Sequence, residues 1–176
     1  YWVDQKTGSW EKDKTGHNYE HTQRILKNCL KLINSNKKID YDVLVASCLL
    51  HDIAYKRGPL KNHHLVGAKD AKKILINMNF PKDKIERVMI AIEDHVGNFS
   101  KAIRKDRDLQ IESKILQDAD NIDALGKMGI VRMKLFSKHQ GVPDFITKND
   151  KLDRSLYGNL KFLLGWPKKM LTPEGR

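Results

Sequence analysis

Cysteine and aromatic residues are scarce in this chain, and no apolar run is long. Only 2 of its 176 residues are cysteine. Cys29 and Cys48 both lie among apolar residues, which is typical of small buried side chains in a reducing cytoplasm rather than of a disulfide or a metal pair. The longest apolar stretch, residues 43–50, falls far short of the roughly 20 residues that cross a bilayer. These absences argue against a disulfide scaffold and a membrane protein, and they favour a cytoplasmic one.

The start of the chain lacks a secretion signal. Its first four residues, Tyr-Trp-Val-Asp, do not show the basic-then-apolar order of such a signal, and the first residue is not methionine. We therefore expect a chain that is shortened or incompletely described at its start. The length fits one domain, and 40% hydrophobic residues suffice for a core. We expect an irregular arm over residues 1–16 and a single domain over residues 17–176.

Basic residues outnumber acidic ones by 33 to 22, so the formal net charge is +11. Such a surplus favours anionic partners, namely phosphorylated small molecules, nucleic acid or a membrane surface. A solvated, lysine-rich surface explains the charge equally well. The basic residues are scattered, without a run of five or more, and no basic stripe is interleaved with aromatics. Nucleic-acid binding is therefore the weaker interpretation.

Hydrophobic residues recur with a helical period through most of the chain, and no alternating strand pattern, internal repeat or low-complexity tract is present. We therefore predict an all-α fold, a helical bundle. An apolar central helix is predicted at residues 42–54. Amphipathic helices are predicted around it, from about His21 to Ile33 and at residues 65–78, 83–95, 111–125, 130–138 and 150–164. Gly126 and Gly129 are predicted to end the helix at residues 111–125.

The last five residues, Thr-Pro-Glu-Gly-Arg, begin like a helix. Thr172 can cap a first turn, and proline fits the first helical position. The apolar residues between 160 and 171 need a cover. We expect either that the natural chain continues or that a second copy covers this segment in a homodimer.

Five histidine and aspartate residues fall on apolar sides or at ends of the predicted helices. Burying an unpaired carboxylate or imidazolium costs several kcal/mol, so each needs a partner inside the protein. A lone histidine of this kind is most often a hydrogen-bonded core residue, but five such residues on four helices favour a shared metal ion. Imidazole and carboxylate together suit several transition metals without selecting strongly among them. The five residues are His21, His51, Asp52, His95 and Asp120.

Three segments resemble the HD-domain metal-dependent phosphohydrolases. They are Gly-His-Asn-Tyr-Glu-His21-Thr-Gln-Arg-Ile, Leu-Leu-His51-Asp52-Ile-Ala and Asp-Ala-Asp120-Asn-Ile-Asp-Ala-Leu-Gly. The resemblance runs from about residue 16 to the end and is greatest to a bacterial branch of predicted HD phosphohydrolases. It implies that His21, His51, Asp52 and Asp120 hold the family's principal metal. By the same pattern His17, one turn before His21, lines the substrate site.

Some members of this superfamily hold a second metal through a His-x-x-x-Gly-Ala segment and a histidine that ends the next helix. The chain has His-His-Leu-Val-Gly-Ala at residues 63–68, in which His63 matches the spacing better than His64. The resemblance thus implies a second ion at His63, His95 and a bridging Asp52, with His64 as the alternative ligand or a substrate contact. The competing interpretation is a single ion, with these histidines binding substrate phosphate.

The resemblance implies hydrolysis of a phosphate ester or anhydride in a small phosphorylated compound, which we expect to be a nucleotide. Metal-activated water would attack phosphorus, with one or two divalent ions of Mn, Mg, Fe, Co, Ni or Zn. Arg24 follows His21 by three residues, so it projects beside the metal face and is a candidate to stabilise charge on the phosphate. Lys56 and Arg57, directly after the predicted helix that carries His51 and Asp52, are further candidates.

Two aspartates beside Asp120 are also candidates. Asp123 lies one helical turn later, where it could orient a water or hold a ligand histidine. Asp118 is a weaker candidate, because two residues of helix turn it about 200° away from Asp120.

One position departs from the nucleotidase branch of the family. In that branch a glutamate three residues after the HD aspartate takes part in catalysis, whereas this chain has Tyr55. The departure argues against transferring that branch's deoxynucleotide specificity. The resemblance also leaves open an HD-fold di-iron oxygenase, which would use the same ligands and O₂.

Overall fold

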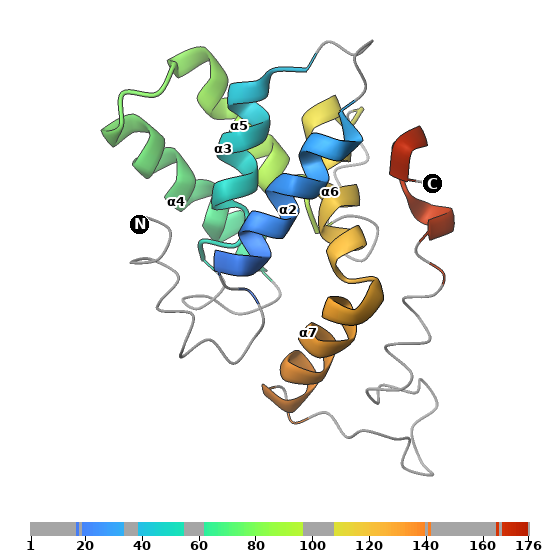
Figure 1. Ribbon diagram of the computed structural model, residues 1–176. Helices are drawn as coiled ribbons and strands as arrows, with labels where there is room; N and C mark the ends of the chain where they lie inside the picture. Colours follow the sequence, from blue (N-terminus) through green and yellow to red (C-terminus); the bar gives the residue numbers. More distant parts are fainter. Residues whose placement is uncertain are drawn as a thin grey trace.

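The computed structural model describes residues 17, 19–33, 39–54, 62–96, 108–139, 141, 165 and 167–175. All regular structure in these ranges is helical, which confirms the predicted all-α fold. None of the helices in them is long and apolar enough to cross a membrane. The predicted arm at residues 1–16 and the predicted helix at 150–164 lie outside the described ranges. The helices are α2 (Tyr19–Leu32), α3 (Tyr41–Leu50), α4 (His63–Asn77), α5 (Lys82–Asp94), α6 (Ile111–Asp123) and α7 (Gly126–His139), with 3-10 turns η4 (Pro167–Lys169) and η5 (Pro173–Gly175) (Figure 1).

The apolar helix α3 occupies the centre of the described fold (Figure 1). One side of it packs with α4 and α5 through buried residues such as Val43, Val88 and Ile92. The other side packs with α2 and α6 through Ile25 and Leu44, among others. Contact on both sides explains why the sequence of α3 is apolar nearly all round.

Helix α3 is shorter than the predicted 42–54 helix. It begins after Asp40, whose carboxylate caps the helix by accepting hydrogen bonds from the amides of Asp42 and Val43. It ends at Leu50, and residues 51–54 form a turn in which the Ile53 amide bonds to the Leu50 carbonyl at 3.2 Å. The His-Asp pair therefore lies in a turn at the end of the central helix, between the two halves of the core.

The corner between α6 and α7 is tighter than the sequence predicts. Helix α7 starts at Gly126, four residues before the predicted helix, and Gly126 has a φ of 76° that glycine adopts without strain. Gly129 lies in the first turn of α7, where a Cβ would collide with the backbone of Ala124. The two glycines therefore let α7 follow α6 directly, and Gly129 does not end a helix.

Asp118 faces the C-terminal segment and not the metal-ligand candidates. Its buried carboxylate accepts hydrogen bonds from the amides of Leu171 and Thr172, at 2.9 and 2.6 Å, and from Thr172 Oγ1 at 2.7 Å. Thr172 in turn caps the η5 turn through a 3.1 Å bond from the Gly175 amide, so the predicted cap forms, but on a 3-10 turn of three residues. Met170 is buried, while the apolar residues at 160–164 and 166 lie outside the described ranges.

We expect Asp118→Ala to lower the free energy of unfolding by about 2–3 kcal/mol, because it leaves the buried Thr172 amide and hydroxyl and the partly buried Leu171 amide without an acceptor. Chemical denaturation would measure this loss. Asp108→Ala, which removes an exposed carboxylate, is the matched control and should change stability by less than about 0.5 kcal/mol. Equal stability of the two variants would show that the segment is not held by Asp118.

Candidate metal centre

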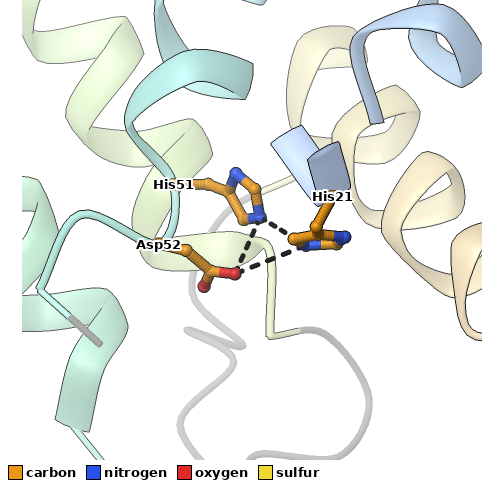
Figure 2. Close-up of side chains that lie close together, drawn as sticks. All are labelled: His21, His51 and Asp52. Carbon is orange, nitrogen blue, oxygen red and sulfur yellow. Dashed lines mark hydrogen bonds and ion pairs between the residues drawn. The ribbon is translucent and has the colours of Figure 1, made fainter. Parts of the chain in front are cut away.

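Three of the predicted ligands meet where α2 passes the end of α3. His21 is fully buried on α2, and its Nε2 lies 3.3 Å from His51 Nε2 and 3.4 Å from Asp52 Oδ2 (Figure 2). His51 Nε2 lies 3.1 Å from the same Asp52 oxygen. Atoms that bind one divalent ion at about 2.0–2.2 Å are themselves about 3.0–3.4 Å apart, so these spacings fit a shared ion.

Asp52 and two further histidines form a second group. His63 Nε2 and His95 Nε2 lie 3.2 Å apart, at 3.7 and 3.6 Å from Asp52 Oδ1. Asp52 thus presents Oδ2 to the first group and Oδ1 to the second, as a carboxylate that bridges two ions would. Each group gathers three ligand atoms within 4.8 Å of one another.

Histidine rings in both groups are oriented in the same way. In the rings of His21, His51 and His95, Nδ1 is hydrogen-bonded to an oxygen of the protein, so the Nε2 lone pair is free to face the other ligand candidates. The acceptors are the Cys48 carbonyl for His51 at 2.8 Å, the Asp123 carboxylate for His21 at 2.8 Å and the Ile92 carbonyl for His95 at 2.5 Å. This arrangement is typical of metal-binding histidines.

Asp120 lies at the edge of the first group. Its Oδ1 is 3.5 Å from His21 Nε2, and 27% of its side chain is exposed, whereas His21 and His51 are buried. Burial alone would raise the pKa of Asp120, but His21 and Arg132 lower it, so the carboxylate is ionised. The structure brings Asp120 next to His21, although it is not part of the compact three-atom group.

The remaining predicted residues lie around the two groups. His17 stacks edge-on against His21, and loss of hydration lowers its pKa to about 3, so its ring is neutral. His64 is buried, and neither ring nitrogen has a hydrogen-bond partner among the described residues. It belongs to neither ligand group, so the structure favours His63 as the ligand. Tyr55, Lys56 and Arg57 lie outside the described ranges.

Asp123 holds His21 in place and is itself held by two arginines. Its carboxylate accepts the His21 Nδ1 hydrogen, Arg24 Nε at 2.5 Å and Arg132 Nη1 at 2.8 Å. Burial would raise the pKa of Asp123, but bonds from His21 and Arg24 hold it well below the usual range. The contact that the structure shows for Arg24 is therefore with Asp123, and its role as a phosphate contact stays a prediction.

Sequence reasoning missed Arg132 on α7. Its guanidinium lies 3.3 Å from His21 Nε2 and 3.7 Å from Asp120 Oδ1, besides binding Asp123. The tight corner at Gly126 and Gly129 brings α7 this close. The one sequence signal was an arginine on the helix directly after the last ligand, which by itself does not distinguish a site residue from a surface one.

The charges of His51 and Asp52 favour a cation between the two ligand groups. Burial would lower the pKa of His51, but the Asp52 carboxylate raises it to about 10. The same contact keeps the pKa of Asp52 well below its ordinary value despite burial. A buried carboxylate therefore stays charged because cations face it, and a divalent ion would replace the proton on His51.

We expect Asp52→Ala to abolish metal retention, because Asp52 is the ligand common to both groups, and His51→Ala to empty the first group. His95→Ala should remove only the ion of the second group. Elemental analysis of the purified variants would give the stoichiometry, with His64→Ala as the control that keeps the wild-type content. Full metal occupancy in Asp52→Ala would show that these residues do not hold the ion.

We expect Asp123→Asn to weaken metal affinity by about 10- to 100-fold, because it removes the charge that orients His21. Competition with a chelator would measure the affinity. The control is Asp83→Asn, which alters an exposed carboxylate in the first turn of α5. If both variants bound metal as tightly as the wild type, the link from Asp123 to His21 would have no effect on the site.

Comparison with known proteins identifies the family to which the chain belongs. The HD domain family model matches residues 18–125. Bacillus subtilis YpgQ is 26% identical over 129 residues, which cover 73% of this chain but only 61% of YpgQ. Among solved structures, a Lactobacillus plantarum protein gives a TM-score of 0.77 at 22% identity, covering 99% of this chain and 82% of that one.

Two further structures share the fold. YpgQ in complex with ADP gives a TM-score of 0.69 at 22% identity, with 99% and 82% coverage. An HD-superfamily hydrolase from Bacillus thuringiensis gives 0.66 at 23% identity, with 99% and 81% coverage. The family match spans more than half of the chain and includes His21, the His51-Asp52 pair and Asp120. The chain therefore belongs to the HD domain family.

Proposed function

We propose that this protein is a metal-dependent phosphohydrolase that cleaves a phosphate ester or anhydride in a small phosphorylated compound, with nucleotides as the substrate class. The observation that carries the proposal is the pair of His/Asp groups that share Asp52, next to an arginine held at the same site. The ADP in the YpgQ structure supports the nucleotide class.

The first ligand group would be His21, His51 and Asp52, with Asp120 at its edge, and the second would be Asp52, His63 and His95. Ions bound there would polarise a phosphoryl oxygen and lower the pKa of a bound water, which supplies a nucleophile at neutral pH. The His21 and His51 rings need no further positioning, because their Nδ1 bonds already fix them. This preorganisation limits the motion required during reaction.

Arg132 is the residue best placed to bind the phosphoryl group. Its guanidinium points at the ligand cluster and keeps its direction through the bond to Asp123. A fixed positive charge there would neutralise the charge that develops on the phosphoryl oxygens. Arg24, which binds Asp123 through both Nε and Nη2, supports this arrangement as a positioning residue.

Two histidines complete the proposed substrate site. The neutral ring of His17 can hydrogen-bond a water or substrate group beside His21. The buried ring of His64 keeps hydrogen-bonding capacity that the described residues leave unused. Phosphate contacts by Lys56 and Arg57 remain predictions from the sequence.

A phosphate-release screen would test the function itself. Nucleoside mono-, di- and triphosphates would be offered with Mn, Mg, Fe, Co, Ni or Zn added singly, with and without oxygen. Release of phosphate or pyrophosphate under anaerobic conditions supports hydrolysis. Turnover that requires O₂, or none with the metal-loaded protein on any phosphate compound, would contradict the proposal.

We expect Arg132→Gln to lower turnover by about 100-fold while the metal content stays unchanged, because the residue acts on the phosphoryl charge. Arg24→Gln should have a smaller effect, which excess metal partly restores, because Arg24 acts through Asp123 and His21. Arg87→Gln removes an arginine from a remote ion-pair network with Asp40 and Glu112, and serves as the control. Turnover of Arg132→Gln within about twofold of wild type would exclude its assigned role.

A further inference from the structure

A basic groove lies between α2 and the α6–α7 corner, separated from the ligand cluster by Asp123. Its volume is about 360 Å³, within the range of small-molecule sites. Asp123 is shared between the two regions, since it binds His21 of the cluster and Arg24 of the groove. We call this the α2–α7 groove. It is lined by Arg24, Lys27, Asn28, Lys31, Ile122, Asp123, Leu125, Lys127 and Met128.

The groove concentrates positive charge, and the described residues neutralise only that of Arg24. Arg24, Lys27 and Lys31 are spaced three and four residues apart, so they share one face of α2, and Lys127 adds a charge from the opposite wall. Asp123 is the one carboxylate among the lining residues, and it already binds His21 and two arginines. None of the three lysines has an ion-pair partner in the described part of the chain.

Two other properties of the groove suit a phosphate-bearing ligand. The 14-residue helix α7 begins at Gly126 beside Lys127, so the positive end of its dipole lies at the groove and offsets the negative end of α6, which stops at Asp123. Ile122, Leu125 and Met128 provide an apolar wall, and Met128 is 44% exposed. The groove therefore offers cations for phosphates and apolar surface for a base or sugar.

We propose that the α2–α7 groove binds a polyphosphate anion, free or carried by a nucleotide, at a site separate from the metal centre. Anion binding in the groove does not depend on the proposed hydrolysis, since the three lysines contact none of the metal-ligand candidates. Anion binding is nevertheless coupled to the metal centre. An anion that binds the Arg24 guanidinium competes for it with Asp123, and Asp123 orients His21. By linkage, metal and anion alter each other's affinity by the same factor.

Calorimetric titration of the full chain, as purified, with tripolyphosphate would test the site. The test variant is Lys27→Gln/Lys31→Gln/Lys127→Gln. The control is Lys69→Gln/Lys72→Gln/Lys73→Gln, which removes the same charge from exposed positions on α4. We expect about tenfold weaker binding in the groove variant and less than twofold change in the control, with affinity falling as salt rises. Metal content by elemental analysis should be equal in all three proteins.

Comparing two ligands distinguishes a nucleotide from free polyphosphate as the natural anion. A methylene-linked, non-hydrolysable ATP analogue that binds about tenfold more tightly than tripolyphosphate, through the same lysines, assigns the site to a nucleotide. Equal affinity assigns it to free polyphosphate, and both results support the groove.

Equal loss in the groove and control variants, or no loss in either, would overturn the proposal. So would a single-stranded RNA that binds through these lysines when tripolyphosphate does not, since the groove would then be part of a nucleic-acid surface. Hydrolysis of p-nitrophenyl phosphate, measured without nucleotide, should stay within twofold of wild type in the groove variant. Because the binding readout needs no turnover, a failure of the proposed function would not affect this result.

Discussion

The buried carboxylate of Asp52 is the constraint on which the rest of this structure depends. It is 7% exposed, and each of its oxygens faces a different pair of histidines. A charge buried to this degree is tolerated only where cations and hydrogen bonds surround it. Helices α2 and α4 and the C-terminal cap of α5 each deliver a histidine to it, and the turn after α3 delivers both Asp52 and His51. The core on both sides of α3 fixes where these elements end, so packing determines the geometry of the centre.

Asp123 connects the buried histidines to the arginines around them. It binds His21 on one side and Arg24 and Arg132 on the others, so one carboxylate links α2, α6 and α7. The charge of Asp123 is maintained by the same residues that it positions. Loss of the Asp123 carboxylate therefore alters the orientation of His21, although Asp123 is not itself one of the metal-ligand candidates.

Much of the fold, and the gathering of the candidate His and Asp ligands, could be predicted from the sequence, because both leave a local pattern. The helical period of α2, α4, α5 and α6 reflects faces that pack on α3, and the His-Asp pair carries a recognisable motif. The point at which α3 ends could not be predicted, since residues 51–54 stay buried after the backbone leaves the helix. Arg132 and the Asp118–Thr172 contact depend on segments that meet only in the folded chain. Their partners are 111 and 54 residues away, respectively, and no spacing rule connects them.

The α6–α7 corner also determines how the chain can vary in length. Asp123 and Arg132 lie nine residues apart on opposite sides of the corner, and both must reach the same histidine. Each residue added within α7 before Arg132 would rotate its side chain by about 100° and shift it by about 1.5 Å along the axis. A single insertion would thus point the guanidinium away from the centre while leaving every ligand in place. The number of residues between Asp123 and Arg132 is therefore as important to the site as the identity of these two side chains.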